Sequence, residues 1–118
     1  MVRNFKNLKI WHRSRAFVKT IYQLSKVFPK EELFGLTSQL KIATVSVLSN
    51  IAEGCGKGTE KDLNRFLDNA VGSSCEVETQ LYLAYDLQFI DKKVMESSTD
   101  EIQQIRRMIV AYQKSLNL

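Results

Sequence analysis

The chain has 118 residues, of which 44% are hydrophobic and 25% are charged, and its formal net charge is +4. A chain of this size can bury one hydrophobic core, so we expect a single domain over residues 1–118. Its apolar runs all fall short of the roughly 18 residues that span a membrane, and its start lacks the apolar stretch of a secretory signal. We therefore expect a cytoplasmic protein without a membrane partner.

The first expected helix starts after Asn7, a residue type favoured at helix N-caps, and runs to about Val27, just before Pro29. Its apolar and small residues recur at spacings of four and three, which is typical of one helix face packed in a bundle. The inward positions are Ile10, Ser14, Phe17, Ile21, Leu24 and Phe28.

The face opposite this stripe is basic. Residues 1–30 contain eight basic residues and no acidic one, whereas the rest of the chain has more acidic than basic residues. Phosphate backbones select such a face through the release of condensed counterions. Alternatively, the face is solvated or meets the acidic surface of another helix or subunit. The residues that we assign to a nucleic-acid surface are Lys9, Arg13, Arg15, Lys19 and Lys26, with Lys41 and Lys57 further along the chain.

The second expected helix runs from about Leu36 to Glu53 and stops at Gly54, where a glycine-rich loop begins. Lys57 lies between glycines of this loop, but the spacing is not that of a phosphate-binding P-loop, and a helix rather than a strand precedes it. Asn50 and Glu53 lie beside the apolar stripe, so they need polar partners. We expect both to be structural and to hydrogen-bond across helix ends or to the loop backbone.

The third expected helix runs from about Glu60 to Gln88 or Phe89. Thr59 followed by Asp62 resembles a capping box at its start. Apolar and small residues again mark one face of this helix. Its inward positions are Leu63, Phe66, Leu67, Ala70, Ser74, Val77, Leu81 and Ala84.

The fourth expected helix opens near Asp91 and continues to Leu116. The segment Ser97–Asp100 either interrupts it, with Ser98 and Glu101 as a new capping box, or belongs to one long helix. The apolar spacing passes through Ser98 without a change of phase, which favours the long helix. Four such helices joined by short loops predict an all-α, antiparallel up-down-up-down four-helix bundle.

The apolar stripes are wider than the interior of one bundle requires. One interpretation leaves the extra residues half-buried at the edge of the bundle. The other, which we favour, buries them between the subunits of a homo-oligomer. The residues concerned are Trp11, Val18, Tyr22, Tyr82, Tyr85 and Phe89.

The sequence has few groups suited to catalysis. A di-iron bundle takes two Glu-x-x-His motifs, but His12 is the single histidine and lies in no such motif. We find no acidic residue within a helical turn of His12 to orient it as a base, and no nucleophilic triad. We therefore expect no enzyme, no metal and no cofactor. Cys55 and Cys75 lie too far apart along the helices to form a disulfide. We expect Cys75 to be buried and Cys55 to be exposed and oxidisable.

Several segments together resemble the four-helix-bundle family of 23S rRNA intervening-sequence proteins, small bacterial proteins often encoded within insertions in ribosomal RNA genes. The segments are FKNLKIW (Phe5–Trp11), FPKEELFGLTSQL (Phe28–Leu40), SVLSNIAEG (Ser46–Gly54) and GSSCEVETQL (Gly72–Leu81). The resemblance implies a left-handed antiparallel bundle that assembles as a ring, a homopentamer, without catalytic residues. A structurally similar group comprises accessory proteins of diversity-generating retroelements, basic rings that bind nucleic acid and a reverse transcriptase.

The chain departs from the pattern of this family at three places. Leu48 stands where members commonly have a proline, so the kink that a proline would cause is not expected. Ile42 follows Lys41 where members commonly have a second basic residue, which weakens a basic patch on the second helix. Lys57 stands where an arginine is common, and it keeps the charge but not the fork of donors that binds phosphate bidentately.

Charge and resemblance together predict a non-enzymatic, oligomeric bundle protein that binds RNA or other nucleic acid through the basic face of its first helix. We expect the contact to be with backbone and shape, because no base-reading motif accompanies the basic face. The alternative is a protein–protein adaptor, a scaffold ring that docks an acidic protein partner without binding nucleic acid.

Overall fold

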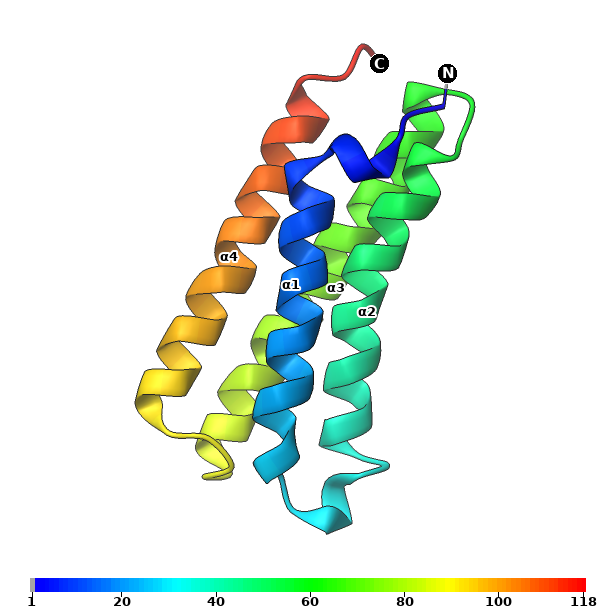
Figure 1. Ribbon diagram of the computed structural model, residues 1–118. Helices are drawn as coiled ribbons and strands as arrows, with labels where there is room; N and C mark the ends of the chain where they lie inside the picture. Colours follow the sequence, from blue (N-terminus) through cyan, green and yellow to red (C-terminus); the bar gives the residue numbers. More distant parts are fainter. Residues whose placement is uncertain (1) are drawn as a thin grey trace.

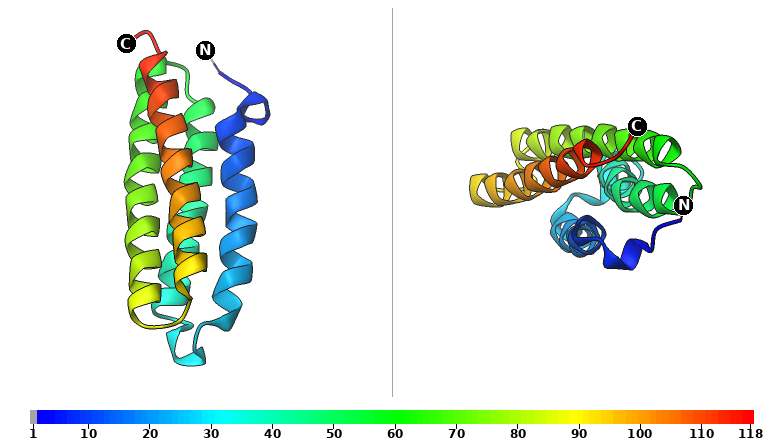
Figure 2. Two further views of the ribbon diagram at one scale, coloured as in Figure 1. Left: turned by 90° about the vertical axis from the view of Figure 1, so that its left-hand side faces the viewer. Right: turned by 90° about the horizontal axis from the view of Figure 1, so that it is seen from above.

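The computed structural model describes residues 2–118, and its four long helices confirm the predicted all-α four-helix bundle. Consecutive helices run in opposite directions and lie side by side in an elongated body (Figures 1 and 2). No strand occurs among residues 2–118. Within the same residues, no helix combines the length and the hydropathy that crossing a membrane requires. The helices are α1 (Lys9–Leu24), α2 (Leu36–Cys55), α3 (Glu60–Asp86) and α4 (Lys92–Lys114).

The chain enters α1 through a short 3-10 turn, η1 (Phe5–Asn7). Asn4 caps this turn, because its Oδ1 accepts a hydrogen bond of 3.0 Å from the Lys6 amide. The N-cap of α1 is Leu8, so the prediction that Asn7 takes this position is wrong: Asn7 is already part of the turn. At the other end, α1 stops at Leu24, and a second 3-10 turn, η2 (Ser25–Val27), covers the rest of the predicted helix.

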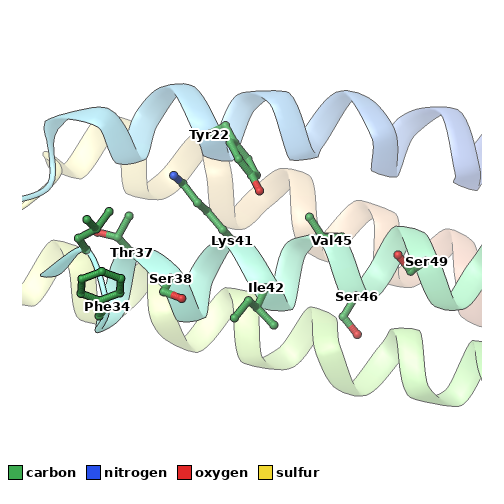
Figure 3. A pocket seen from close by; sticks show the side chains of 10 residues that line it. Tyr22, Phe34, Thr37, Ser38, Lys41, Ile42, Val45, Ser46 and Ser49 are labelled. Atoms are coloured by element: carbon green, nitrogen blue, oxygen red, sulfur yellow. The ribbon is translucent and has the colours of Figure 1, made fainter.

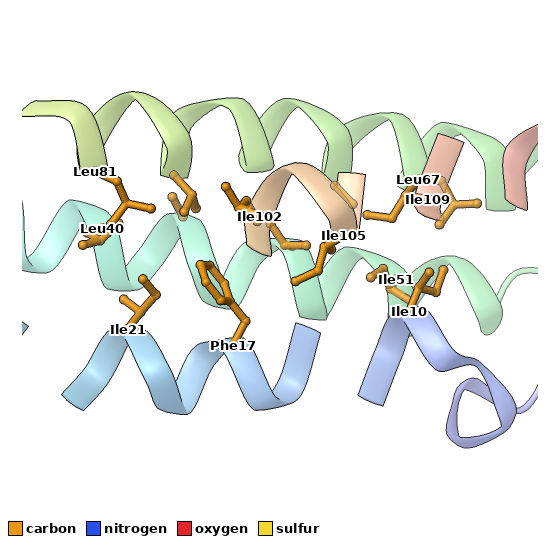
Figure 4. Packing of buried hydrophobic residues seen from close by; sticks show 14 of the residues in the cluster. Ile10, Phe17, Ile21, Leu40, Ile51, Leu67, Leu81, Ile102, Ile105 and Ile109 are labelled. Carbon is orange, nitrogen blue, oxygen red and sulfur yellow. The ribbon is translucent and has the colours of Figure 1, made fainter. Parts of the chain in front are cut away.

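The core lies along the axis of the bundle and contains apolar side chains from all four helices. Phe17 and Ile21 of α1 point between the other helices toward residues such as Leu40 of α2 (Figure 4). The predicted inward stripes of the first three helices are confirmed, apart from the half-buried Leu24 and Phe66. On the stripe of the fourth helix, Val94, Tyr112 and Leu116 are also half-buried. The largest fully buried apolar side chains are Ile21, Leu40, Val47, Ile51, Leu63, Leu67, Val77, Leu81, Ile102, Ile105 and Ile109.

The helices α2 and α3 approach each other closely at the corner that joins them. A Cβ atom on Gly54 would lie 2.9 Å from Leu63 Cδ1 and 3.0 Å from Phe66 Cβ. Gly54 is therefore not the stop that we predicted: α2 continues through it to Cys55, with Gly56 as the C-cap. Its missing side chain lets α3 pack against the last turn of α2.

The predicted start of α3 is confirmed, since Thr59 Oγ1 accepts a hydrogen bond of 3.1 Å from the Asp62 amide. Its end comes earlier than predicted, at Asp86, because Gln88 adopts the left-handed conformation with φ 64°. The Phe89 amide then donates to the Ala84 carbonyl at 2.8 Å, the bond that closes a Schellman motif. This local geometry overrides the apolar spacing that favoured a longer helix.

The fourth helix is continuous through Ser97–Asp100, as the phase of its apolar residues predicted. Asp91 caps it, accepting a hydrogen bond of 2.8 Å from the Val94 amide. Ser98 does not act as a new cap, because its hydroxyl donates back to the Val94 carbonyl of the preceding turn at 2.7 Å.

The two cysteines have the opposite environments from those expected. Cys55 is only 1% exposed, at the corner between α2 and α3, and this burial raises the pKa of its thiol. Cys75 is exposed on α3, one position past the buried Ser74. Both expectations were wrong, because the close approach at Gly54 buries the corner and the phase of α3 turns Cys75 outward.

Candidate nucleic-acid interface

The basic side chains that follow the outer side of α1 are solvent-exposed. Lys9, Arg15 and Lys19 belong to α1, and Lys26 follows in η2. In the described part of the chain, no carboxylate forms a salt bridge with any of these four. Arg15 stacks over Trp11, with its Cζ 5.4 Å from the ring centroid, so one of the four is held in place by an aromatic side chain.

Arg13 does not belong to this exposed set. Its Nε and Nη2 donate to the two carboxylate oxygens of Glu101 in α4, both at 2.9 Å, and Nη2 also donates to Gln104 Oε1 at 2.6 Å. The hydrogen bonds with Glu101 raise the pKa of the Arg13 guanidinium above its ordinary value. Arg13 therefore links α1 to α4 and is not part of the exposed basic set. Its spacing, three residues after the buried Ile10 and four before the buried Phe17, is a sequence signal that it flanks the core.

Lys41 and Lys57 lie near opposite ends of α2. The Lys41 ammonium is 4.6 Å from the Tyr22 ring centroid, and Figure 3 shows the two side chains reaching toward each other. Lys57 follows α2 in the corner and lies 5.0 Å from the ring centroid of Phe66. Lys26 and Lys41 line a common cavity near the start of α2, whereas Lys57 lies beyond the other end of this helix. The seven basic residues predicted from the sequence therefore do not form one cluster.

The two polar residues predicted to be structural differ in their contacts. Asn50 Nδ2 donates to the Ser46 carbonyl at 2.8 Å and to Ser46 Oγ at 3.0 Å. Ser46 Oγ in turn bonds to Ser73 Oγ of α3 at 2.9 Å, so Asn50 belongs to a polar link between the helices. Glu53 is exposed, and its carboxylate makes no hydrogen bond or salt bridge within residues 2–118. The prediction that Glu53 hydrogen-bonds across the helix ends or to the loop backbone is therefore wrong for the single chain.

The aromatic residues assigned to an oligomer interface fall into two groups. Trp11 packs against Phe5 at a centroid distance of 4.9 Å, and Phe89 packs against Phe28 at 5.4 Å, so the chain itself half-buries both. Val18 is also half-buried. The exposed group is Tyr22, Tyr82 and Tyr85.

Sequence reasoning missed the two most prominent apolar side chains on the surface near α2. Phe34 is 92% exposed and Ile42 is 67% exposed. Both line a groove between α1 and α2 of about 570 Å³, which also contains Tyr22, Lys41 and Val45 (Figure 3). The sequence could have predicted this apolar surface, because α2 has apolar residues on its outer side as well as on its buried stripe.

The described residues hold no cluster of metal-ligating groups: nowhere in residues 2–118 do three His, Cys, Asp or Glu side chains gather closely enough to bind a metal. His12 Nε2 contacts the Lys6 carbonyl at 2.6 Å in an exposed position.

The comparisons with known proteins place this fold in a family. A solved structure with a TM-score of 0.83 is a protein of unknown function from the S23 ribosomal protein family of Bacteroides thetaiotaomicron VPI-5482. It is 21% identical, and the match covers 90% of this chain and 99% of that chain. Among curated proteins, no match is found. The model of the 23S rRNA-intervening sequence protein family matches residues 6–111, so the chain belongs to this family.

Proposed function

We propose that this protein is a non-enzymatic, self-associating bundle that binds RNA or another nucleic acid through the exposed cations of α1 and η2. The observation that supports this proposal is the set Lys9, Arg15, Lys19 and Lys26, which carries four positive charges without a carboxylate partner in the described chain. We call these four residues the α1 basic surface. The free cysteines Cys55 and Cys75 favour a reducing compartment, the cytoplasm.

The spacing of the α1 basic surface suits a phosphate backbone. From Lys9 to Lys26 the chain rises by roughly 25 Å, at ~1.5 Å per residue. Successive phosphates along one strand are ~3.4 Å apart along the axis, so this length can meet several of them. Contacts of this kind position a nucleic acid without reading its bases.

Self-association would cover the apolar surface around α2. Ile42 and Phe34 are large, exposed and close to the exposed Tyr22 in one groove. Large exposed apolar patches are unfavourable on an isolated monomer, and a ring of identical subunits would bury one on each of them. A ring would also repeat the α1 basic surface around its axis and so strengthen weak contacts through avidity. The homopentamer that the family resemblance implies is the stoichiometry we expect.

A charge-reversal experiment tests the nucleic-acid part of the proposal. Lys9, Arg15 and Lys19 are changed together to Glu, and binding to a structured RNA is measured by titration at 50 and 200 mM salt. We expect the native protein to lose at least tenfold in affinity at the higher salt, and the variant to bind at least tenfold more weakly at the lower salt.

The matched control reverses three exposed lysines elsewhere, Lys61, Lys93 and Lys114, which changes the net charge by the same amount. We expect the control to keep most of its affinity. Equal losses in both variants, or binding that does not respond to salt, would contradict the proposal. Capture of an acidic protein that survives nuclease and depends on Lys9, Arg15 and Lys19 would favour the adaptor function instead.

The self-association part has its own test. Ile42→Glu should reduce the molar mass measured by light scattering, because it places a charge in the proposed contact. Val27→Glu is the control, since Val27 is equally exposed (71%) but does not line the groove. A native protein that is monomeric at 100 μM would refute self-association.

A further inference from the structure

A second concave site lies where the chain passes from α1 to α2. The connection contains η2 and a third 3-10 turn, η3 (Lys30–Glu32), and together with the start of α2 these turns line an open cavity of about 400 Å³. This volume lies in the range of small-molecule sites. We call it the end cavity. Its lining residues are Ser25, Lys26, Phe28, Pro29, Lys30, Leu33, Thr37 and Lys41.

The charges around the end cavity favour an anion. Lys26, Lys30 and Lys41 line it, and no carboxylate is among its lining residues. The nearest acidic residues are Glu31 and Glu32 of η3, and neither lines the cavity. Glu32 Oε1 accepts a hydrogen bond of 3.1 Å from the Leu36 amide, so this carboxylate is held at the start of α2. Three ammonium groups around one concavity raise the local concentration of anions.

Thr37 supplies an independent sign that the end cavity takes a ligand. Its side chain is only 6% exposed, yet its hydroxyl makes no hydrogen bond within residues 2–118. The hydroxyl oxygen is not among the buried polar atoms that lack a partner, so it opens onto the concave surface and is free to donate to a ligand there. Figure 3 shows that Thr37 and Lys41 also border the α1–α2 groove, so both reach concave surface.

We propose that the end cavity binds the phosphate of a phosphorylated ligand of mononucleotide size. Lys26, Lys30 and Lys41 neutralise the phosphate, and the Thr37 hydroxyl donates a hydrogen bond to one of its oxygens. Phe28, Pro29 and Leu33 cover the apolar part of the ligand. The end cavity shares Lys26 with the α1 basic surface. It goes beyond the proposed function, because it needs neither Lys9, Arg15 and Lys19 nor the assembly of subunits.

Calorimetry with AMP as the probe, in a phosphate-free buffer, tests the site. We expect one AMP per chain and binding of adenosine, which lacks the phosphate, at least tenfold weaker. Lys30→Gln and Thr37→Val should each weaken AMP binding about tenfold, whereas Thr37→Ser should retain it because serine keeps the hydroxyl. Lys114→Gln, at the far end of α4, is the control and should bind AMP like the native protein.

Several outcomes would overturn the proposal: no saturable binding of AMP, equal binding of adenosine, or equal losses in Lys30→Gln and Lys114→Gln. Lys30 is exposed, so its variant remains informative if Thr37→Val fails to fold. Loss of RNA binding in the triple variant of Lys9, Arg15 and Lys19, with AMP binding unchanged, separates this site from the α1 basic surface.

The phosphate could belong to a free nucleotide or to the end of a nucleic-acid strand, and a second arm distinguishes these sources. Two RNA strands of the same sequence are compared, one with a 5′-phosphate and one with a 5′-hydroxyl. A preference for the phosphorylated strand that Thr37→Val abolishes supports a strand end as the ligand. Equal affinity for both strands, with AMP binding intact, supports a free nucleotide.

Discussion

Arg13 and Glu101 form a two-point ion pair across the bundle although they are 88 residues apart in the sequence. The pair joins α1 to α4, the two helices that also border a groove of about 460 Å³ lined by Thr20, Ser97 and other residues. Because α1 makes fewer contacts with α4 than with α2, polar side chains provide an important part of the connection between α1 and α4. The acid-free beginning of the chain is thus partly neutralised by α4.

Glu101→Gln should lower the free energy of unfolding by about 0.5–1 kcal/mol, because it removes the charge of a planar two-point pair. The value is modest because the Arg13 and Glu101 side chains are 38% and 32% exposed. Urea unfolding measures it. Glu96→Gln is the matched control on the same helix, since Glu96 meets Lys92 only at 3.8 Å in an exposed position. Equal effects of the two changes would show that the ion pair adds nothing.

The close approach at Gly54 leads to a pair of opposite predictions for two glycines within helices. Gly54→Ala should destabilise the fold by about 1–3 kcal/mol, because the new methyl group would overlap Leu63 and Phe66. Gly72→Ala should stabilise it by about 0.5–1 kcal/mol, because the added Cβ meets nothing within 4 Å and alanine favours the helix. Thermal unfolding of both variants checks the signs, and a stabilising Gly54→Ala would refute the close approach.

The carboxylate of Glu78 should make stability fall in acid. Burial acts to raise its pKa, but hydrogen bonds from Gln103, Arg106 and Tyr82 outweigh this and hold the pKa below its usual value. A group whose pKa is lower in the folded state contributes stability above its unfolded pKa of about 4.3, and this contribution is lost as the pH falls through the folded pKa.

Glu78→Gln should therefore cost about 2 kcal/mol at pH 7 and progressively less below about pH 4. Urea unfolding between pH 7 and pH 3 measures the difference between native protein and variant. Glu60, whose pKa is lowered by its hydrogen bond from Arg3, leaves some acid dependence in the variant. A difference that stays constant with pH would contradict the role of Glu78.

The cysteines should differ sharply in reactivity. Cys75 is exposed and should react with a thiol reagent in the folded protein within minutes, whereas the buried Cys55, with its raised pKa, should react only when the corner opens or the chain unfolds. Cys75→Ser and Cys55→Ser identify which thiol is labelled. Fast labelling of the Cys75→Ser variant would show that the corner is open in solution.

The helices and their inward faces could be predicted because both are local properties. The period of 3.6 residues places Phe17, Ile21 and Ile105 on inward stripes, and the caps Thr59 and Asp91 act on their own first turns. The same reasoning identified the cations of the α1 basic surface, since exposure opposite a core stripe follows from the helix period. The four segments that carry the family resemblance, such as Ser46–Gly54, are likewise local stretches of the sequence.

Contacts between residues distant in the sequence could not be predicted and are visible only in the folded bundle. No pattern along the chain pairs Arg13 with Glu101, and none shows that Gly54 makes room for Leu63 rather than ending a helix. The end cavity likewise needs the folded turn that brings Lys30 beside Thr37 and Lys41. The side of each helix that faces inward can be predicted from the residue order alone, because it depends on the 3.6-residue period. Which partner each flanking residue meets depends on how closely the helices approach, and only the packed bundle sets that distance.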